Sequence, residues 1–174
     1  MRVRALFISE GEIGMVGEVM NRMIGFFGKD ARRIHHFLKV HGFARAIALQ
    51  EGVDADALRV IELAALTHDI GIKPSEEKYG SSAGRYQEIE GPAPARELLG
   101  KAGCPDDMAE RVAWLIAHHH SYSSIREIDH QILVEADFLV NIYEDEIGPA
   151  EVASVREKIF KTRTGMTFLN RIYG

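Results

Sequence analysis

Hydrophobic residues recur along most of this chain at steps of three and four positions, the spacing of an α-helix with one buried face. In residues 12–27 this stripe consists of Ile13, Val16, Met20, Met23, Ile24 and Phe27. Gly, Pro and Asp separate the periodic segments, whereas the dipeptides that close β-hairpins are absent from these junctions. The pattern therefore predicts an all-α helical bundle.

Capping residues mark where the expected helices begin and end. Asp30 suits the N-cap of a second helix and Gly52 its C-terminal end, while Asp54 or Asp56 suits the start of a third helix. The expected helices cover residues 12–27, 31–50, about 55–68, 93–102, 106–119, 129–143 and 149–160, with a last turn or two at 164–173. Residues 72–89 contain Pro74 and several Gly and Ser with little periodicity, so we expect a loop there.

Length and composition indicate a soluble protein of one domain. The chain has 174 residues, 46% of them hydrophobic and 27% charged, and no segment has the composition of an interdomain linker. A single domain over 1–174 is expected, with an N-terminal helix within 1–29 and C-terminal helices within 144–174. The net charge of −5, with no basic cluster, argues against a dedicated nucleic-acid surface.

The sequence also favours a cytoplasmic location. No apolar run approaches the roughly 20 residues of a membrane span, and the apolar residues in 1–8 are too few for a signal peptide. Cys104 is the single cysteine and has no partner for an internal disulfide, which suits a reducing compartment.

Two polar residues fall on helix faces that are otherwise apolar. Asp137 lies among hydrophobic neighbours in the segment 132–143, and His36 shares a face with Val40, Ala44 and Ile47. A buried carboxylate is costly unless it is paired, and a metal ion is one suitable partner. Taken singly, each residue is more simply explained as a hydrogen-bonded member of the core.

The pair His68–Asp69 changes this reading, because it places two metal-binding side chains together at the expected end of a helix. With His36 and Asp137 it provides nitrogen and oxygen donors that suit Mn, Fe, Co, Ni, Zn or Mg, and the absence of thiolates argues against a structural zinc site. A divalent cation lowers the pKa of its bound water and offsets phosphoryl charge. Hydrolysis of a phosphate ester is the chemistry to expect.

Three segments resemble the motifs of the HD-domain metal-dependent phosphohydrolases. They are residues 33–36 followed by Val40, residues 63–71 ending in His68-Asp69-Ile70-Gly71, and residues 135–137, and the similarity extends over about 30–143. The resemblance implies a helical HD-type fold, one divalent ion held by His36, His68, Asp69 and Asp137, and attack by metal-bound water that Asp69 positions or deprotonates. Residues 120–124 lack the Gly-Tyr-Pro signature of the cyclic-dinucleotide branch, so we do not expect cyclic di-GMP turnover.

Some members of this family bind two metal ions, which makes further residues candidates. His119 and His118 occupy the region where an additional histidine ligand occurs, and Glu90 stands where another ligand could enter. The plain alternative for His118 and His120 is a polar helix end, weighed evenly against contact with a substrate phosphate.

Positive charge near a substrate phosphate could come from Lys73 or Arg85, although solvated surface charge is the simpler explanation for both. Lys73 lies two residues after Gly71, whereas many family members place a lysine immediately after that glycine. His119 and Lys73 join Asp69 as candidate catalytic residues, and His118, Lys73 and Arg85 as candidate substrate-binding residues.

We therefore predict a metal-dependent phosphohydrolase that acts on a small phosphorylated substrate such as a nucleotide. One alternative is a sensor module that uses the same residues to bind metal or nucleotide without turnover. A second is an interaction bundle in which the histidines are incidental. The sequence leaves open the substrate, the metal, the number of ions and whether the chain forms a homodimer.

Overall fold

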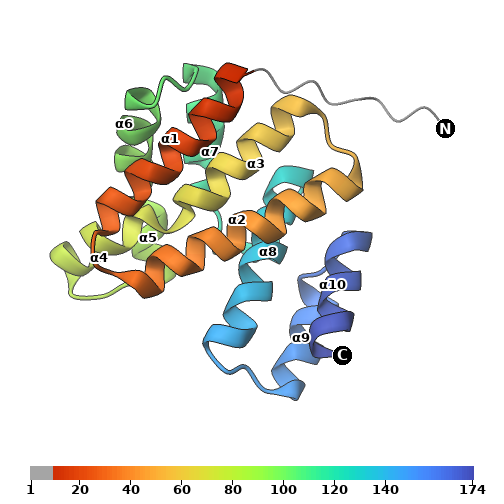
Figure 1. Ribbon diagram of the computed structural model, residues 1–174. Coiled ribbons are helices and arrows are strands. Elements are labelled where there is room, and N and C mark those ends of the chain that lie inside the picture. The colour runs from red at the N-terminus through yellow and green to blue at the C-terminus, as the bar shows by residue number, and fades with distance from the viewer. Residues whose placement is uncertain (1–9) are drawn as a thin grey trace.

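The computed structural model describes residues 10–174, with side chains from residue 14 onward; residues 1–9, which include the N-terminal segment considered above, and the side chain of Ile13 lie outside the described part. Within residues 10–174 every regular element is a helix (Figure 1), which confirms the all-α prediction. None of the helices described is both long and apolar enough to cross a bilayer.

The helices pack with α2 and α3 lying against each other and α8 crossing behind them (Figure 1). Helices α9 and α10 lie at one end, and α4 and α5 at the other. Two short 3-10 turns, η1 (His68–Gly71) and η2 (Tyr122–Ser124), follow α3 and α7. The α-helices are α1 (Glu10–Phe27), α2 (Ala31–Glu51), α3 (Ala55–Thr67), α4 (Ile72–Tyr79), α5 (Gly84–Glu90), α6 (Pro92–Lys101), α7 (Asp106–Ile116), α8 (Ile128–Glu144), α9 (Pro149–Lys158) and α10 (Arg163–Tyr173).

The expected caps are present at α2 and α3. Asp30 accepts a hydrogen bond from the Arg33 amide at 3.1 Å, and Asp54, rather than Asp56, accepts one from the Ala57 amide at 2.8 Å. Gly52 ends α2 in the left-handed conformation, with φ of 74°. Local capping chemistry therefore fixes both ends of the loop between these two helices.

Helix α3 forms the centre of the bundle. Every residue from Leu58 to Thr67 is buried, which is typical of a helix enclosed on all sides rather than one with a single buried face. It packs against α1, α2, α7 and α8. At its end, His68 is buried between several helices and Asp69 is partly exposed.

The prediction of a loop at residues 72–89 is wrong, because α4 and α5 occupy most of this segment. Pro74 lies in the first turn of α4, where its missing N–H interrupts no helical hydrogen bond. Gly80, with φ of 63°, ends α4, and the following serines fill only the short connection to α5. The Gly and Ser residues thus mark one turn rather than a long irregular loop.

Two other helix bounds also differ from expectation. Helix α7 ends at Ile116 instead of continuing through His119, and the chain turns over residues 117–120. At the C-terminus, α10 is a full helix of 11 residues, and the Thr162 side chain caps it by accepting from the Gly165 amide.

Gly71 is required by a close approach of two backbones. A Cβ atom at this position would lie 2.6 Å from the carbonyl oxygen of Gln87 and 3.0 Å from the Cα of Gly91. We expect Gly71→Ala to lower the free energy of unfolding by about 1–3 kcal/mol, the usual cost of overpacking, as measured by urea denaturation. Gly42→Ala is the matched control, since nothing lies within 4 Å of its Cβ position on the exposed face of α2.

In the control variant, alanine in a helix interior should leave stability unchanged or raise it by about 0.5–1 kcal/mol. Equal stability of the two variants would show that α5 does not pack closely on η1.

Candidate metal centre

Four side chains predicted from sequence to bind one metal ion converge between three parts of the bundle. His36 comes from α2, His68 and Asp69 from η1, and Asp137 from α8. The His36 Nε2 atom lies 3.2 Å from Asp137 Oδ1, 3.4 Å from Asp69 Oδ2 and 3.3 Å from His68 Nε2. His68 Nε2 lies 3.5 Å from Asp69 Oδ2 and 3.6 Å from Asp137 Oδ1.

These separations fit the coordination shell of a single divalent cation. With metal–ligand bonds of about 2.0–2.2 Å, neighbouring ligand atoms in tetrahedral or octahedral geometry lie roughly 3–3.5 Å apart. Two imidazole nitrogens and two carboxylate oxygens at such distances form a donor set that suits borderline-hard divalent metals. The residues present therefore fit a bound cation.

The tautomers of the histidines point to the same conclusion. His68 Nδ1 lies 2.9 Å from the carbonyl oxygen of Ala65, and His119 Nδ1 lies 2.6 Å from that of Ile116. A carbonyl oxygen can only accept, so in both rings Nδ1 carries a proton, and in the neutral form of either ring the lone pair lies on Nε2. His36 is held alike, with Nδ1 3.0 Å from Glu144 Oε2. Such partners orient histidine ligands in metal sites.

A second group of possible ligands adjoins the first through Asp69. Ligand atoms of Asp69, His119 and His120 lie within 4.8 Å of one another, and Asp69 Oδ1 is 3.9 Å from His119 Nε2. The Nε2 atoms of both histidines are buried and have no hydrogen-bond partner among the residues that the structure describes. Because an unsatisfied buried nitrogen is costly, this pair is suited to a second cation that shares Asp69.

His120 was considered from the sequence as a possible contact to a substrate phosphate, but not as a metal ligand. The helix was expected to continue through His119. In such a helix the side chains of His119 and His120 would point in different directions. Because α7 ends at Ile116, the chain turns and brings the rings of His119 and His120 to a centroid distance of 3.9 Å. The sequence did not indicate where α7 ends, and this position determines that the two rings meet.

Burial and neighbouring charges shift the pKa values of two histidines in the centre, in opposite directions. Burial of His36 disfavours its charged form, but the Asp137 and Asp69 carboxylates outweigh burial and raise its pKa to about 9. Burial lowers the pKa of His119 to about 3, with His120 and His68 adding to the effect. Without a metal ion, His36 therefore holds a second ring proton at neutral pH. The ring of His119 is neutral, and its Nε2 atom can bind a cation without losing a proton.

Two of the other candidate ligands do not join either group. The ring of His118 stacks on Trp114 at a centroid distance of 4.2 Å, and its Nδ1 lies 2.7 Å from the Trp114 carbonyl oxygen. The Glu90 carboxylate instead accepts hydrogen bonds from Lys78 Nζ and Tyr79 Oη, each at 2.7 Å.

The two basic side chains expected to contact a substrate phosphate also have other partners. Lys73 Nζ donates to the carbonyl oxygen of Phe26 at 2.7 Å and lies over the Phe26 ring. Arg85 is exposed, and its guanidinium lies over the ring of Tyr86 at 4.6 Å. Neither side chain lines the cavity at the candidate centre.

A cavity of about 400 Å³ opens onto His36 and Asp69, and Arg32 and Arg33 line it. Both arginines lie about one helical turn before His36, so they share its side of α2. Arg33 pairs with Glu76 at 2.5 Å, and Arg32 with Asp145 at 3.3 Å. Their spacing from His36 was the signal that could have identified them in the sequence.

The chain resembles known proteins in both sequence and structure. The HD domain family matches residues 33–151 of the chain. A solved structure described as a predicted HD superfamily hydrolase from an uncultured Thermotogales bacterium is 28% identical in sequence, with a TM-score of 0.65 over 90% of this chain and 84% of that one. No curated protein matches the sequence. The family predicted from the sequence motifs is confirmed: the chain belongs to the HD domain family.

Proposed function

We propose that this protein hydrolyses a phosphate ester with the help of divalent cations held by the histidine–aspartate groups. The observation that carries the proposal is the orientation of three histidines. His36, His68 and His119 are each held at Nδ1 by the protein, and each directs Nε2 toward a carboxylate of Asp69 or Asp137. The description of the related structure as a predicted hydrolase supports the same class of reaction.

Divalent cations supply two things to such a reaction, a water of lowered pKa and an offset for the charge of the phosphoryl group. The role that this chain gives to Asp69 follows from its two oxygens, since Oδ2 faces His36 and His68 while Oδ1 faces His119. Asp69 is therefore positioned to orient the attacking water between the two groups and to accept its proton. The water oxygen bonds to phosphorus as the ester P–O bond breaks, and the proton that Asp69 accepted passes, directly or through solvent, to the departing oxygen. A phosphomonoester thus yields an alcohol and inorganic phosphate.

Arg32 and Arg33 are the cationic side chains best located to contact the substrate. They line the same cavity as His36 and Asp69, and a guanidinium can donate two hydrogen bonds to phosphoryl oxygens at once. In this proposal they take the phosphate-binding role that the sequence had suggested for Lys73 and Arg85.

The test is a hydrolysis screen, with the products separated by chromatography, on protein loaded separately with Mn²⁺, Fe²⁺, Co²⁺, Ni²⁺, Zn²⁺ or Mg²⁺. The panel holds nucleoside monophosphates and triphosphates, cyclic nucleotides and sugar phosphates. We expect hydrolysis of at least one ester, its loss on chelation and its recovery when the cation is restored. Cation-loaded protein that hydrolyses none of them would contradict the proposal and favour a sensor that binds without turnover.

A further inference from the structure

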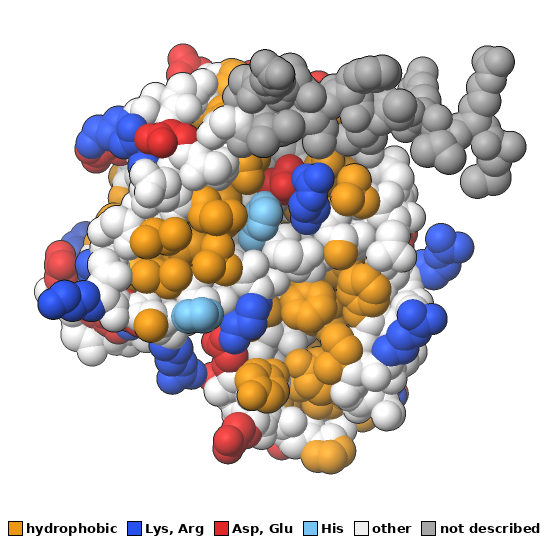
Figure 2. Space-filling model, viewed as in Figure 1, with side chains coloured by type: hydrophobic (Ala, Val, Ile, Leu, Met, Phe, Trp, Pro, Cys, Tyr) orange, Lys and Arg blue, Asp and Glu red, His pale blue; other side chains and the backbone are white. Residues whose placement is uncertain are grey.

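The turn that follows α7 carries two residues of the second group of possible ligands, His119 and His120. Since α7 ends at Ile116, its regular hydrogen bonds do not fix these two side chains. His119 is only 2% exposed, and on the face drawn in Figure 2 histidine covers little of the surface. Neighbouring elements must therefore hold the turn in place.

Glu88 of α5 holds this turn at its backbone. The Oε1 atom of Glu88 accepts hydrogen bonds from the His120 amide and from the Ser121 hydroxyl, each at 3.0 Å. The Glu88 side chain is half-buried, so water competes less for these hydrogen bonds than it would at the surface. The carboxylate thus fixes the backbone atoms from which the His120 ring projects.

Helix α5 also contacts the ring of His120. A Cβ atom at Gly84 would lie 2.6 Å from both Cγ and Cδ2 of that ring, so a larger residue would displace it. Gly84 and Glu88 are four residues apart and therefore share one side of α5. The same helix packs on η1, the turn that carries Asp69. Helix α5 therefore connects the segment that carries His120 to the segment that carries Asp69.

Two further contacts hold the turn and its ring. The His130 Nε2 atom lies 3.0 Å from the carbonyl oxygen of His118, and the His120 Nδ1 atom lies 3.2 Å from the Tyr122 hydroxyl oxygen. When Nδ1 of His120 donates to that hydroxyl, the lone pair of the neutral ring lies on Nε2. This Nε2 atom is buried and has no hydrogen-bond partner among the residues that the structure describes. The ring is therefore held as a metal ligand would be.

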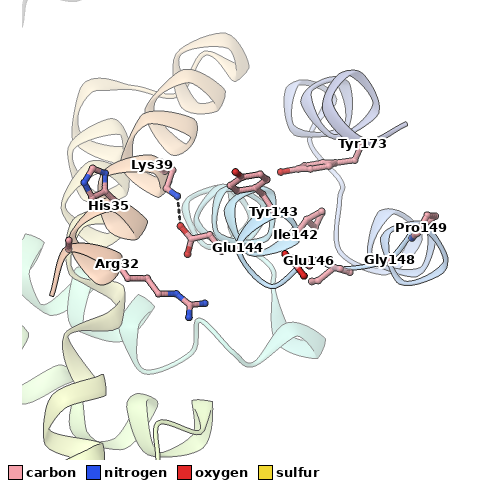
Figure 3. Close-up of a pocket in the computed structure, with 12 residues that line it drawn as sticks. Arg32, His35, Lys39, Ile142, Tyr143, Glu144, Glu146, Gly148, Pro149 and Tyr173 are labelled. Carbon is pink, nitrogen blue, oxygen red and sulfur yellow. Dashed lines mark hydrogen bonds and ion pairs between the residues drawn. The ribbon is translucent and has the colours of Figure 1, made fainter.

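The first group of ligands has a comparable outer carboxylate. Glu144, at the end of α8, lies 3.0 Å from His36 Nδ1 and pairs with Lys39 (Figure 3). Glu144 acts on the ring of its histidine, whereas Glu88 acts on the backbone of His120. Loss of an outer partner of this kind typically lowers metal affinity by about 10–100-fold. Each group therefore has a carboxylate that can hold a histidine ligand in place.

We propose that Glu88 is a positioning residue for a second cation bound by Asp69, His119 and His120. The inference rests on the proposed function, in which cations occupy both histidine–aspartate groups, and adds a residue that acts on the second cation through His120. Without the Glu88 carboxylate, the His120 amide and the Ser121 hydroxyl lose their common acceptor. The His120 ring is then no longer fixed beside Asp69.

The first test measures Mn²⁺ binding by calorimetric titration and by electron paramagnetic resonance. The wild type should bind two ions per chain, and two ions that share Asp69 should give a magnetically coupled spectrum. In Glu88→Ala the affinity for the second ion should fall by about tenfold or more. The spectrum of an isolated ion should remain, because the first group does not depend on Glu88.

Glu88→Gln should bind both ions much as the wild type does, since an amide oxygen can accept the same two hydrogen bonds. Glu97→Ala is the matched control, because it truncates an exposed glutamate that pairs with Lys101 on α6. Undiminished binding of two ions by Glu88→Ala, or an equal loss in Glu88→Gln and Glu88→Ala, would overturn the proposal. A single ion in the wild type would also overturn it, while leaving hydrolysis at the first group possible.

The second test follows hydrolysis of p-nitrophenyl phosphate as the Mn²⁺ concentration is raised. Glu88→Ala should need about tenfold or more Mn²⁺ for its half-maximal rate, with the KM for the ester unchanged. A lower kcat at saturating Mn²⁺, with the same Mn²⁺ requirement as the wild type, would overturn the proposal. Absence of hydrolysis in the wild type would count against the proposed function alone, and Mn²⁺ binding would then decide for or against the role of Glu88.

Discussion

Replacing Asp69 with Asn should lower kcat/KM for the proposed phosphate ester hydrolysis by about a thousandfold or more, because it removes the charge shared by both histidine–aspartate groups. Asp69 Oδ2 lies beside His36 and His68, and Oδ1 faces His119, so one substitution affects both groups. The asparagine NH₂ group would also direct a donor where a cation needs an acceptor. The Asp69 side chain keeps 16% of its surface exposed at the cavity, so the variant should retain the wild-type fold.

Phosphate release, bound metal per chain and circular dichroism together check this expectation. Glu90→Gln is the matched control, since it makes the same carboxylate-to-amide change on a residue whose carboxylate pairs with Lys78 and Tyr79 instead. It should hydrolyse substrate and bind metal as the wild type does. Unchanged activity and metal content in Asp69→Asn, or an equal loss in Glu90→Gln, would place the reaction elsewhere in the molecule.

The affinity for divalent cations should rise by about tenfold per pH unit for each proton displaced, up to about pH 9. Because the pKa of His36 is raised from 6.5 to about 9, the metal-free protein holds a proton there at pH 7. The ring must lose this proton before Nε2 can bind a cation, so binding releases a proton and weakens as pH falls. The pKa of His68 is raised as well, against the effect of its burial, by Asp69 and Asp137.

Calorimetric titration with Mn²⁺ at pH 7.5, in two buffers of different protonation enthalpy, counts the released protons. His118→Gln serves as the control, because His118 stacks on Trp114 outside the centre and its replacement should leave the proton count unchanged.

The metal-free protein should also lose stability as pH rises from 6.5 through about 9, since a raised histidine pKa stabilises the fold only while the proton is bound. An affinity that levels off near pH 6.5, with no proton released at pH 7.5, would contradict this view of His36.

The residues that sequence alone placed together are those whose polarity conflicts with their surroundings. His36 and Asp137 interrupt apolar helix faces, and His68 and Asp69 end a helix that is buried on all sides. Helical periodicity indicates which face of α2 and α8 turns inward, and the resemblance to the HD-domain phosphohydrolases implies that these four residues meet at one metal ion. Their separations of 3.2–3.6 Å agree with that expectation.

The positions of the other candidate site residues depend on where short helices begin and end. Helix propensity predicts these ends poorly, because tertiary packing sets them. Helices α4 and α5 replace an expected loop and carry Lys73, Arg85 and Glu90 to partners away from the centre. The early end of α7 brings His120 beside His119. A one-turn error at either place changes which side chains face the cavity.

The most direct test of the metal centre is an anomalous difference map from crystals of the protein grown with Mn²⁺, recorded at a wavelength where manganese scatters anomalously. We expect a peak within bonding distance of His36, His68, Asp69 and Asp137. A second peak near His119 and His120 is expected if the adjoining group also binds Mn²⁺. Crystals with Mn²⁺ bound elsewhere, or with no peak among these four side chains, would show that the cluster is not a metal site.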